Sequence, residues 1–187
     1  MKPTEIKEKV SITNKAMTLG TILGIYQIVK YLMFALSLSV PSFSFMFTIM
    51  ALGVPVVAFY LQRWFRDKYS PKLFPFFLSW MVSFLTFFFS VVLSMVFCYV
   101  ALELFDKEGR FFTLLSNQLI ISADLYSSMD GIDAEMIEQI ERLAKVVGSM
   151  EPIYFVKMLI PAVFSTGNIL SVIIALITTK SIRSLIK

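Results

Sequence analysis

Two lysines lie within long apolar stretches of this 187-residue sequence, where a charged side chain is costly and usually serves a function. Lys30 lies near the end of the first stretch, with Gln27 about one helical turn before it, and Lys157 lies near the start of the last stretch. An ammonium group within an apolar stretch, near its end, could bind a lipid phosphate or line a translocation path. The alternative is that both lysines reach ordinary headgroups or pair with neighbouring acids.

Other chemistry is restricted by composition. The sequence has no histidine and a single cysteine, Cys98. Histidine-dependent hydrolase triads, thiolate metal sites and intrachain disulfides are therefore excluded. We expect Asp124, Asp130 and Asp133 to be solvated turn and cap residues, because no nucleophile or metal cluster accompanies them. We therefore expect neither enzymatic activity nor a cofactor.

The composition is that of an integral membrane protein, with 57% hydrophobic and only 16% charged residues. A membrane-spanning helix needs about 20 apolar residues. One membrane domain over residues 1–187 is predicted, with spans at about 16–38, 44–62, 73–103 and 153–179. The first is expected to be a retained span, because its apolar part exceeds the roughly 7–15 residues of a signal peptide.

Basic residues gather at one end of the predicted spans. Eleven of the 17 lysines and arginines flank that end, whereas the stretch at about 104–152 is acidic and belongs to the other side. The eleven are Lys2, Lys7, Lys9, Lys15, Arg63, Arg66, Lys68, Lys72, Lys180, Arg183 and Lys187. The positive-inside rule then predicts that both termini are cytoplasmic. Charge at span ends, rather than along one polar face, argues against nucleic-acid binding.

The acidic stretch contains two segments with helical periodicity, joined by a turn at Ser127–Gly131. The second segment has an apolar face that we consider a candidate partner face, formed by Met136, Ile140, Leu143 and Val147. The predicted fold is therefore an all-α membrane protein, with four transmembrane helices and an outer helical hairpin between spans three and four. This hairpin either covers the helix bundle or docks a partner.

Small residues recur at helical spacing within three of the spans, which is typical of helix contacts in lipid. The candidates for helix packing are Gly20, Gly24, Ser83, Ser90, Ser94, Gly167 and Ser171. The alternatives are that the hydroxyl stripe lines a substrate path or that small residues mediate homo-oligomer formation. Hydroxyls without an ionisable partner more often bond to backbone carbonyls, which favours packing.

Three features together suggest a family. These are the Gly20-Thr-Ile-Leu-Gly24 region of span one, the Arg63-Trp-Phe-Arg-Asp-Lys68 end of span two, and the acidic amphipathic loop before span four. In this layout, over nearly the whole chain, the protein resembles the bacterial four-span membrane proteins grouped as domain of unknown function 4199. The resemblance implies a bacterial inner (cytoplasmic) membrane location. It also implies a partner connected with envelope functions, such as a polyprenyl-phosphate glycosyltransferase.

Two functions from different classes follow from these observations. The first is a non-enzymatic subunit or scaffold of an envelope-associated membrane complex, with membrane lipids and another membrane protein as its partners. The second is a small lipid-carrier or solute translocator that uses Lys30, Gln27 and Lys157. Many carriers are built from related halves, and no internal repeat is visible in this sequence. The first function is therefore favoured.

Overall fold

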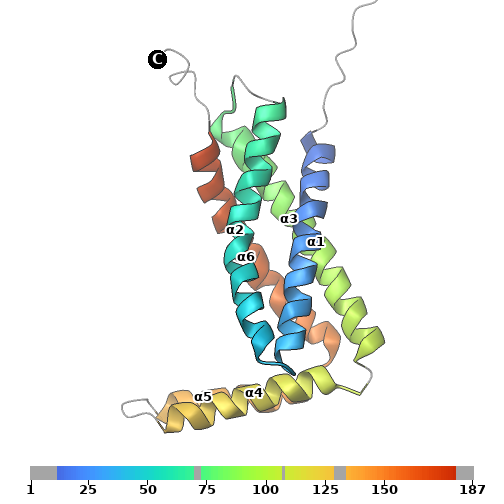
Figure 1. Cartoon of the computed structure of the whole chain (residues 1–187), viewed down its shortest axis with the longest axis vertical. Helices are drawn as coiled ribbons and strands as arrows, with labels where there is room; N and C mark the ends of the chain where they lie inside the picture. Colours follow the sequence, from blue (N-terminus) through green and yellow to red (C-terminus); the bar gives the residue numbers. More distant parts are fainter. Residues whose placement is uncertain (1–11, 70–72, 107, 129–133, 180–187) are drawn as a thin grey trace, which may run out of the picture. The chain divides into compact units, whose positions relative to one another are not determined.

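The computed structural model describes residues 12–69, 73–106, 108–128 and 134–179, and within these ranges it contains six helices and no strand (Figure 1). Four helices are long and apolar enough to cross a membrane: α1 (Ile12–Ser37), α2 (Ser42–Tyr69), α3 (Phe76–Phe105) and α6 (Pro152–Thr178). The shorter helices α4 (Arg110–Ser127) and α5 (Ala134–Gly148) lie between α3 and α6 in the chain. The prediction of an all-helical protein with four long apolar helices is confirmed.

The helices begin and end close to the predicted limits, except at the end of α2. The apolar stretch of span two was expected to end near residue 62, but α2 continues to Tyr69. Its last turns remain helical because Phe65 is buried and packs at 6.0 Å, ring centroid to ring centroid, against Phe74. The basic residues beyond the predicted limit of span two, such as Arg66, therefore lie within the helix.

Two tight corners connect α1 to α2 and α3 to α4. Between α1 and α2, the chain turns at Pro41, where the ring disfavours continuation of the first helix. Between α3 and α4, the Asp106 side chain accepts a hydrogen bond from the Phe111 amide at 2.9 Å, and Gly109 adopts a left-handed conformation (φ 65°). A carboxylate at this position satisfies one of the free N–H groups that every helix N-terminus exposes.

The chain forms two compact units. Unit 1 comprises Met1–Gln27, Leu52–Ser94 and Ala162–Lys187, so its described part contains portions of all four long helices. Its interior holds two clusters of buried apolar side chains, one around Phe65 and Phe74 and the other around Leu23 and Phe87.

Helices α1 and α3 approach each other closely within unit 1. A Cβ atom on Gly20 would lie 2.5 Å from the Cβ of Phe89 and 2.9 Å from the Thr86 carbonyl oxygen. A Cβ on Gly24, one turn further along α1, would lie 2.8 Å from a methyl carbon of Leu93. Only hydrogen therefore fits at Gly20, whereas a methyl group at Gly24 would require the Leu93 side chain to move. Small residues at such positions are usual where helices pack closely in lipid.

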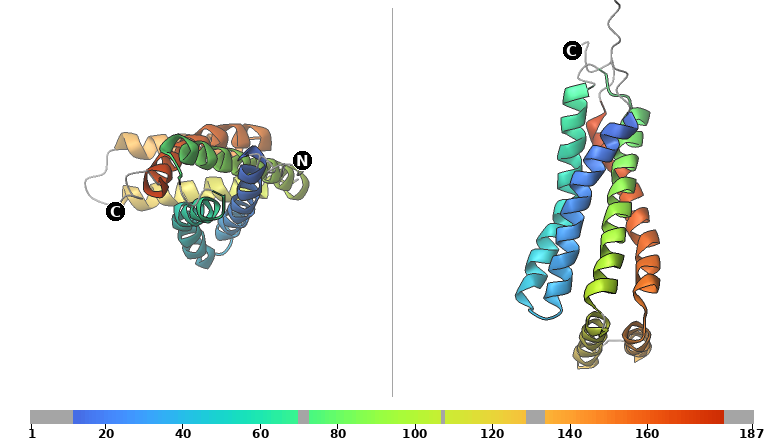
Figure 2. Two further views of the ribbon diagram at one scale, coloured as in Figure 1. Left: turned by 90° about the horizontal axis from the view of Figure 1, so that it is seen from above. Right: turned by 90° about the vertical axis from the view of Figure 1, so that its right-hand side faces the viewer.

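Unit 2 comprises Ile28–Ala51 and Met95–Pro161 and includes α4 and α5. These two helices lie side by side, as the two views of Figure 2 show. The Ser116 hydroxyl of α4 donates a hydrogen bond of 2.8 Å to the Ala144 carbonyl of α5, and Ser116 also lies next to Gly148. A residue early in α4 thus meets the end of α5, so the two helices are antiparallel.

Several sequence predictions fall outside the described residues. These include the turn and cap residues Asp130 and Asp133, the basic residues before Ile12, Lys72, and the basic residues after Thr179.

The fit of α1 against α3 leads to a first prediction. Replacement of Gly20 by alanine should lower the free energy of unfolding by about 1–3 kcal/mol, because the new methyl group meets Phe89 and the Thr86 backbone. Thermal or denaturant unfolding in detergent micelles measures this change. Ile25→Ala is the matched control, since Ile25 lies on the same helix and is 55% exposed. Equal stability of both variants would contradict the close contact.

Candidate functional site

A network of polar side chains joins α2, α3 and α6 inside unit 1. Gln62 is 2% exposed, and its amide nitrogen donates hydrogen bonds to the Ser79 carbonyl at 2.7 Å and to the Ser79 hydroxyl at 3.1 Å. The Ser79 hydroxyl lies 2.8 Å from the Thr178 hydroxyl. Arg66 reaches the same end of α6 and donates to the Thr178 carbonyl at 3.3 Å. The network therefore links three helices through neutral groups and one guanidinium.

Gln27, a candidate translocation residue, is also buried in unit 1. Its amide nitrogen donates a hydrogen bond of 2.8 Å to the Ser90 hydroxyl of α3. The candidate packing residue Ser90 is fully buried, as are Ser94 and Ser171. Such an amide–hydroxyl bond between two membrane helices is a common means of holding them together.

Most other hydroxyls in the small-residue stripe bond to the backbone of their own helix. Ser94 donates to the Val91 carbonyl at 3.1 Å, and Ser171 donates to the Asn168 carbonyl at 2.7 Å. Ser83 differs, because its buried hydroxyl has no hydrogen-bond partner among the described residues. A third glycine, Gly167 of α6, packs against Phe87, which would lie 3.3 Å from an added Cβ. These contacts satisfy helix packing without requiring a substrate.

Lys30 lies in unit 2 and is half-buried. Its ammonium nitrogen is 4.1 Å from the centroid of the neighbouring Tyr31 ring, a distance at which a cation is attracted to the face of an aromatic ring. Lys157 also lies in unit 2, where it is exposed, and its nitrogen is 5.5 Å from the Tyr154 ring. Each lysine thus has an aromatic neighbour on its own helix.

The candidate partner face on α5 divides into two parts. Val147 is buried and Ile140 is half-buried, on the side of α5 that packs against α4. Met136 and Leu143 remain 53% and 43% exposed. At about 100° per residue, Met136 and Leu143 lie next to the side of α5 that contacts α4, and on the opposite side from Glu138 and Lys145.

On α4, Ile121 and Leu125 are similarly exposed, at 59% and 62%. We call these four exposed residues, Ile121, Leu125, Met136 and Leu143, the apolar side of the α4–α5 pair. The side of α5 opposite Met136 and Leu143 carries polar groups, including an exposed ion pair of Arg142 with Glu138 at 2.6 Å. Helix α5 is therefore amphipathic.

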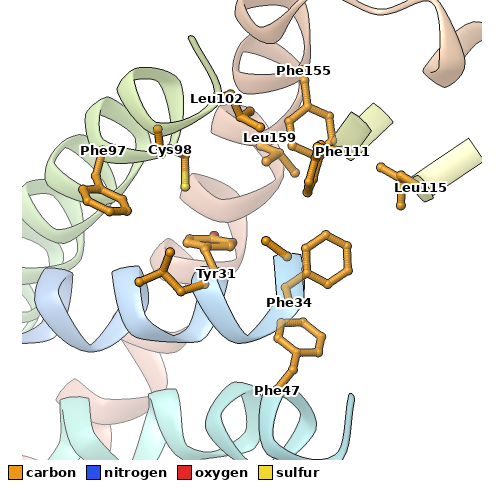
Figure 3. A pocket seen from close by; sticks show the side chains of 13 residues that line it. Tyr31, Phe34, Phe47, Phe97, Cys98, Leu102, Phe111, Leu115, Phe155 and Leu159 are labelled. Carbon is orange, nitrogen blue, oxygen red and sulfur yellow. The ribbon is translucent and has the colours of Figure 1, made fainter. Parts of the chain in front are cut away.

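A cavity of about 310 Å³ lies within unit 2 (Figure 3). Five helices contribute to its lining: α1 provides Tyr31, Leu32, Phe34 and Ala35, α2 provides Phe47, α3 provides Phe97, Cys98, Ala101 and Leu102, α4 provides Phe111 and Leu115, and α6 provides Phe155 and Leu159. Lys157 points away from it, because Phe155 and Leu159 lie about 160° around α6 from Lys157.

Sequence analysis did not identify this cavity or the role of Gln62. Gln62 stands beside Arg63 at the predicted end of span two, where a polar residue is unremarkable. The cavity residues come from five separate helices, and aromatic side chains in a membrane span are ordinary packing or lipid-facing residues. The only available signal for Gln62 in the sequence was that a polar residue of span two could be buried opposite the hydroxyl stripe of span three.

The fold and these sites define a class of protein: an all-α membrane protein with four apolar helices and an additional amphipathic helical pair. The chain belongs to the family described as Protein of unknown function (DUF4199), whose model matches residues 18–180. This confirms the family resemblance. No curated protein and no solved structure matches the chain.

The hydrogen bond between Gln27 and Ser90 leads to a second prediction. In a double-mutant cycle of Gln27→Ala and Ser90→Ala, the two changes should be coupled by about 0.6 kcal/mol, the average for hydrogen bonds between membrane helices. Unfolding in detergent or bicelles measures the three variants. The control cycle pairs Gln27→Ala with Thr21→Ala, since the exposed Thr21 hydroxyl donates to the Met17 carbonyl of its own helix. Additive effects in both cycles would contradict a structural role for the bond.

Proposed function

We propose that the protein is a non-enzymatic subunit or scaffold of an envelope-associated complex in the bacterial inner membrane. The observation that carries this proposal is the apolar side of the α4–α5 pair. The four side chains that form it stay exposed although the two helices are held together by Ser116, Ala144 and Val147. A surface of this kind, next to a polar and charged side, is typical of a contact with another protein or with the membrane.

The proposed orientation of the protein in the membrane is based on the distribution of its basic residues. The basic residues at the end of α2 and near both ends of the chain favour the cytoplasmic side. Both termini are then cytoplasmic, and the α4–α5 pair is an outer helical hairpin. Because Phe111 and Leu115 line a cavity together with residues of the long helices, we expect the apolar side of the pair to face the lipid boundary. A partner that meets it there would itself be a membrane protein.

The proposed partner class is the one that the family resemblance implied, a polyprenyl-phosphate glycosyltransferase. A second copy of this chain is the other partner that such an apolar side would fit.

A small lipid-carrier or solute translocator is the second candidate, and one observation favours it. Lys30 is a half-buried charge within α1, and such charges commonly mark a substrate path. The hydrogen bond of Gln27 to Ser90 and the exposure of Lys157 argue against a path through all three residues. This candidate requires that Lys30→Met abolishes function while the unfolding temperature is unchanged.

The scaffold proposal leads to a third prediction, which uses a photo-crosslinking amino acid placed in the full-length protein in native membranes. At Leu125, on the apolar side of the pair, irradiation should yield a crosslink to one membrane protein. The same amino acid at Arg142, on the polar side, should not. Leu143→Ser combined with the crosslinker at Leu125 should lower the yield roughly tenfold, as for an interface residue worth about 1.4 kcal/mol.

The matched control for Leu143→Ser is Glu141→Ser, which changes an exposed residue on the same helix. Its crosslinking yield should equal that of the unchanged protein. Crosslinks from Leu125 to lipid alone would show that the apolar side contacts only the membrane, and the scaffold proposal would then be wrong.

A further inference from the structure

The cavity of unit 2 is almost entirely apolar. Its lining side chains carry only two polar atoms, the Tyr31 hydroxyl oxygen and the Cys98 sulfur. Aromatic rings form much of its wall: the centroids of Phe34 and Phe47 lie 5.2 Å apart, and those of Phe111 and Phe155 lie 5.6 Å apart. Figure 3 shows these rings around a common space, with Cys98 and Tyr31 directed toward it.

Water is a poor occupant for this space. A buried water molecule needs about two to four polar partners, and an apolar cavity of about 150 Å³ stays dry and accepts benzene instead. At about 310 Å³, the cavity is larger than an ordinary packing defect and reaches the lower end of small-molecule sites, about 300–1,000 Å³. It therefore needs an apolar occupant to recover the contacts that an empty space loses.

The position of the cavity indicates which apolar molecules surround it. Four of the five helices that line it, α1, α2, α3 and α6, are long and apolar enough to span a membrane, so hydrocarbon chains surround them. The lining extends along α3 from Phe97 to Leu102, a rise of about 7.5 Å at 1.5 Å per residue. This length accommodates a segment of a hydrocarbon chain.

We propose that this cavity binds one acyl chain of a membrane phospholipid, with Phe111 and Leu115 of α4 beside the chain where it enters and Tyr31 and Cys98 at its inner part. The bound chain completes the packing between α4 and the long helices of unit 2. This inference does not depend on the proposed partner, because it concerns lipid and a different set of side chains.

Cys98 makes the test direct, because it is the only cysteine in the sequence and it lines the cavity. The full-length protein is purified and delipidated in a steroid-based detergent, which has no alkyl chain. Labelling of Cys98 by methyl methanethiosulfonate is then followed by intact mass, with and without added palmitoyl-oleoyl phosphatidylethanolamine. At a lipid concentration ten times its dissociation constant, labelling should slow about tenfold.

A second reporter separates cavity binding from general coverage by lipid. Val96 lies on the same helix, is 58% exposed and does not line the cavity. In the variant Val96→Cys with Cys98→Ser, the phospholipid should slow labelling far less than at Cys98. An equal effect at both positions would overturn the proposal.

A cavity-filling variant provides the matched test. Ala101→Leu adds a side chain to the lining, so Cys98 should label slowly and the phospholipid should have no further effect. Ala162→Leu is the control, since it makes the same change at an exposed position of α6, and it should keep the lipid effect. If Ala101→Leu fails to fold by circular dichroism, Ala35→Leu, also in the lining, replaces it.

The identity of the chain is tested by competition. Under the same conditions, an isoprenoid alcohol phosphate should protect Cys98 less well than the phospholipid. Stronger protection by the isoprenoid than by the phospholipid, or no protection by either, would overturn the assignment of an acyl chain. None of these outcomes affects the crosslinking test of the partner surface, which reports on Leu125, ten residues further along α4 than Leu115.

Discussion

Lipid offers the helices of this protein no hydrophobic gain from associating with one another, so unit 1 depends on how closely α1 and α3 can approach. Gly20 leaves room only for hydrogen against Phe89, and Gly24 lies close to the Leu93 side chain. On the same two helices, Leu23 and Phe87 belong to one apolar cluster and Gln27 bonds to Ser90, so this cluster and this bond depend on the contact. Larger residues at Gly20 would separate both sets of partners.

The polar side chains of the spans are used mainly to join helices. Gln27 and Gln62 each donate to a serine of α3, and Ser79 extends the second of these links to α6. In lipid such groups have no water to satisfy them, which explains why amides and hydroxyls meet one another or a backbone carbonyl. This use of the stripe favours a structural role for the interior of unit 1 over a substrate path.

Unit 2 differs from unit 1, because the first and later turns of α4 have different surroundings. Its first turns place Phe111 and Leu115 in the wall of the apolar cavity, and its later turns expose Ile121 and Leu125 beside Met136 and Leu143 of α5. Both regions are apolar, and neither is covered by the described part of the chain. The proposed acyl chain would fill the first, and the proposed partner would cover the second. The bond between Ser116 and Ala144 holds α4 and α5 together.

The number of membrane helices, the all-helical class and the family followed from the sequence alone, because long apolar stretches in lipid have to satisfy their backbone groups internally as helices. The amphipathic period of α5 likewise predicted its apolar face. Only the tertiary structure decided which part of that face is free, since Val147 is buried and Leu143 stays exposed. The same holds for Gln62 and the cavity around Cys98. Periodicity within one helix shows which side is apolar or small, but not which residues of other helices meet it.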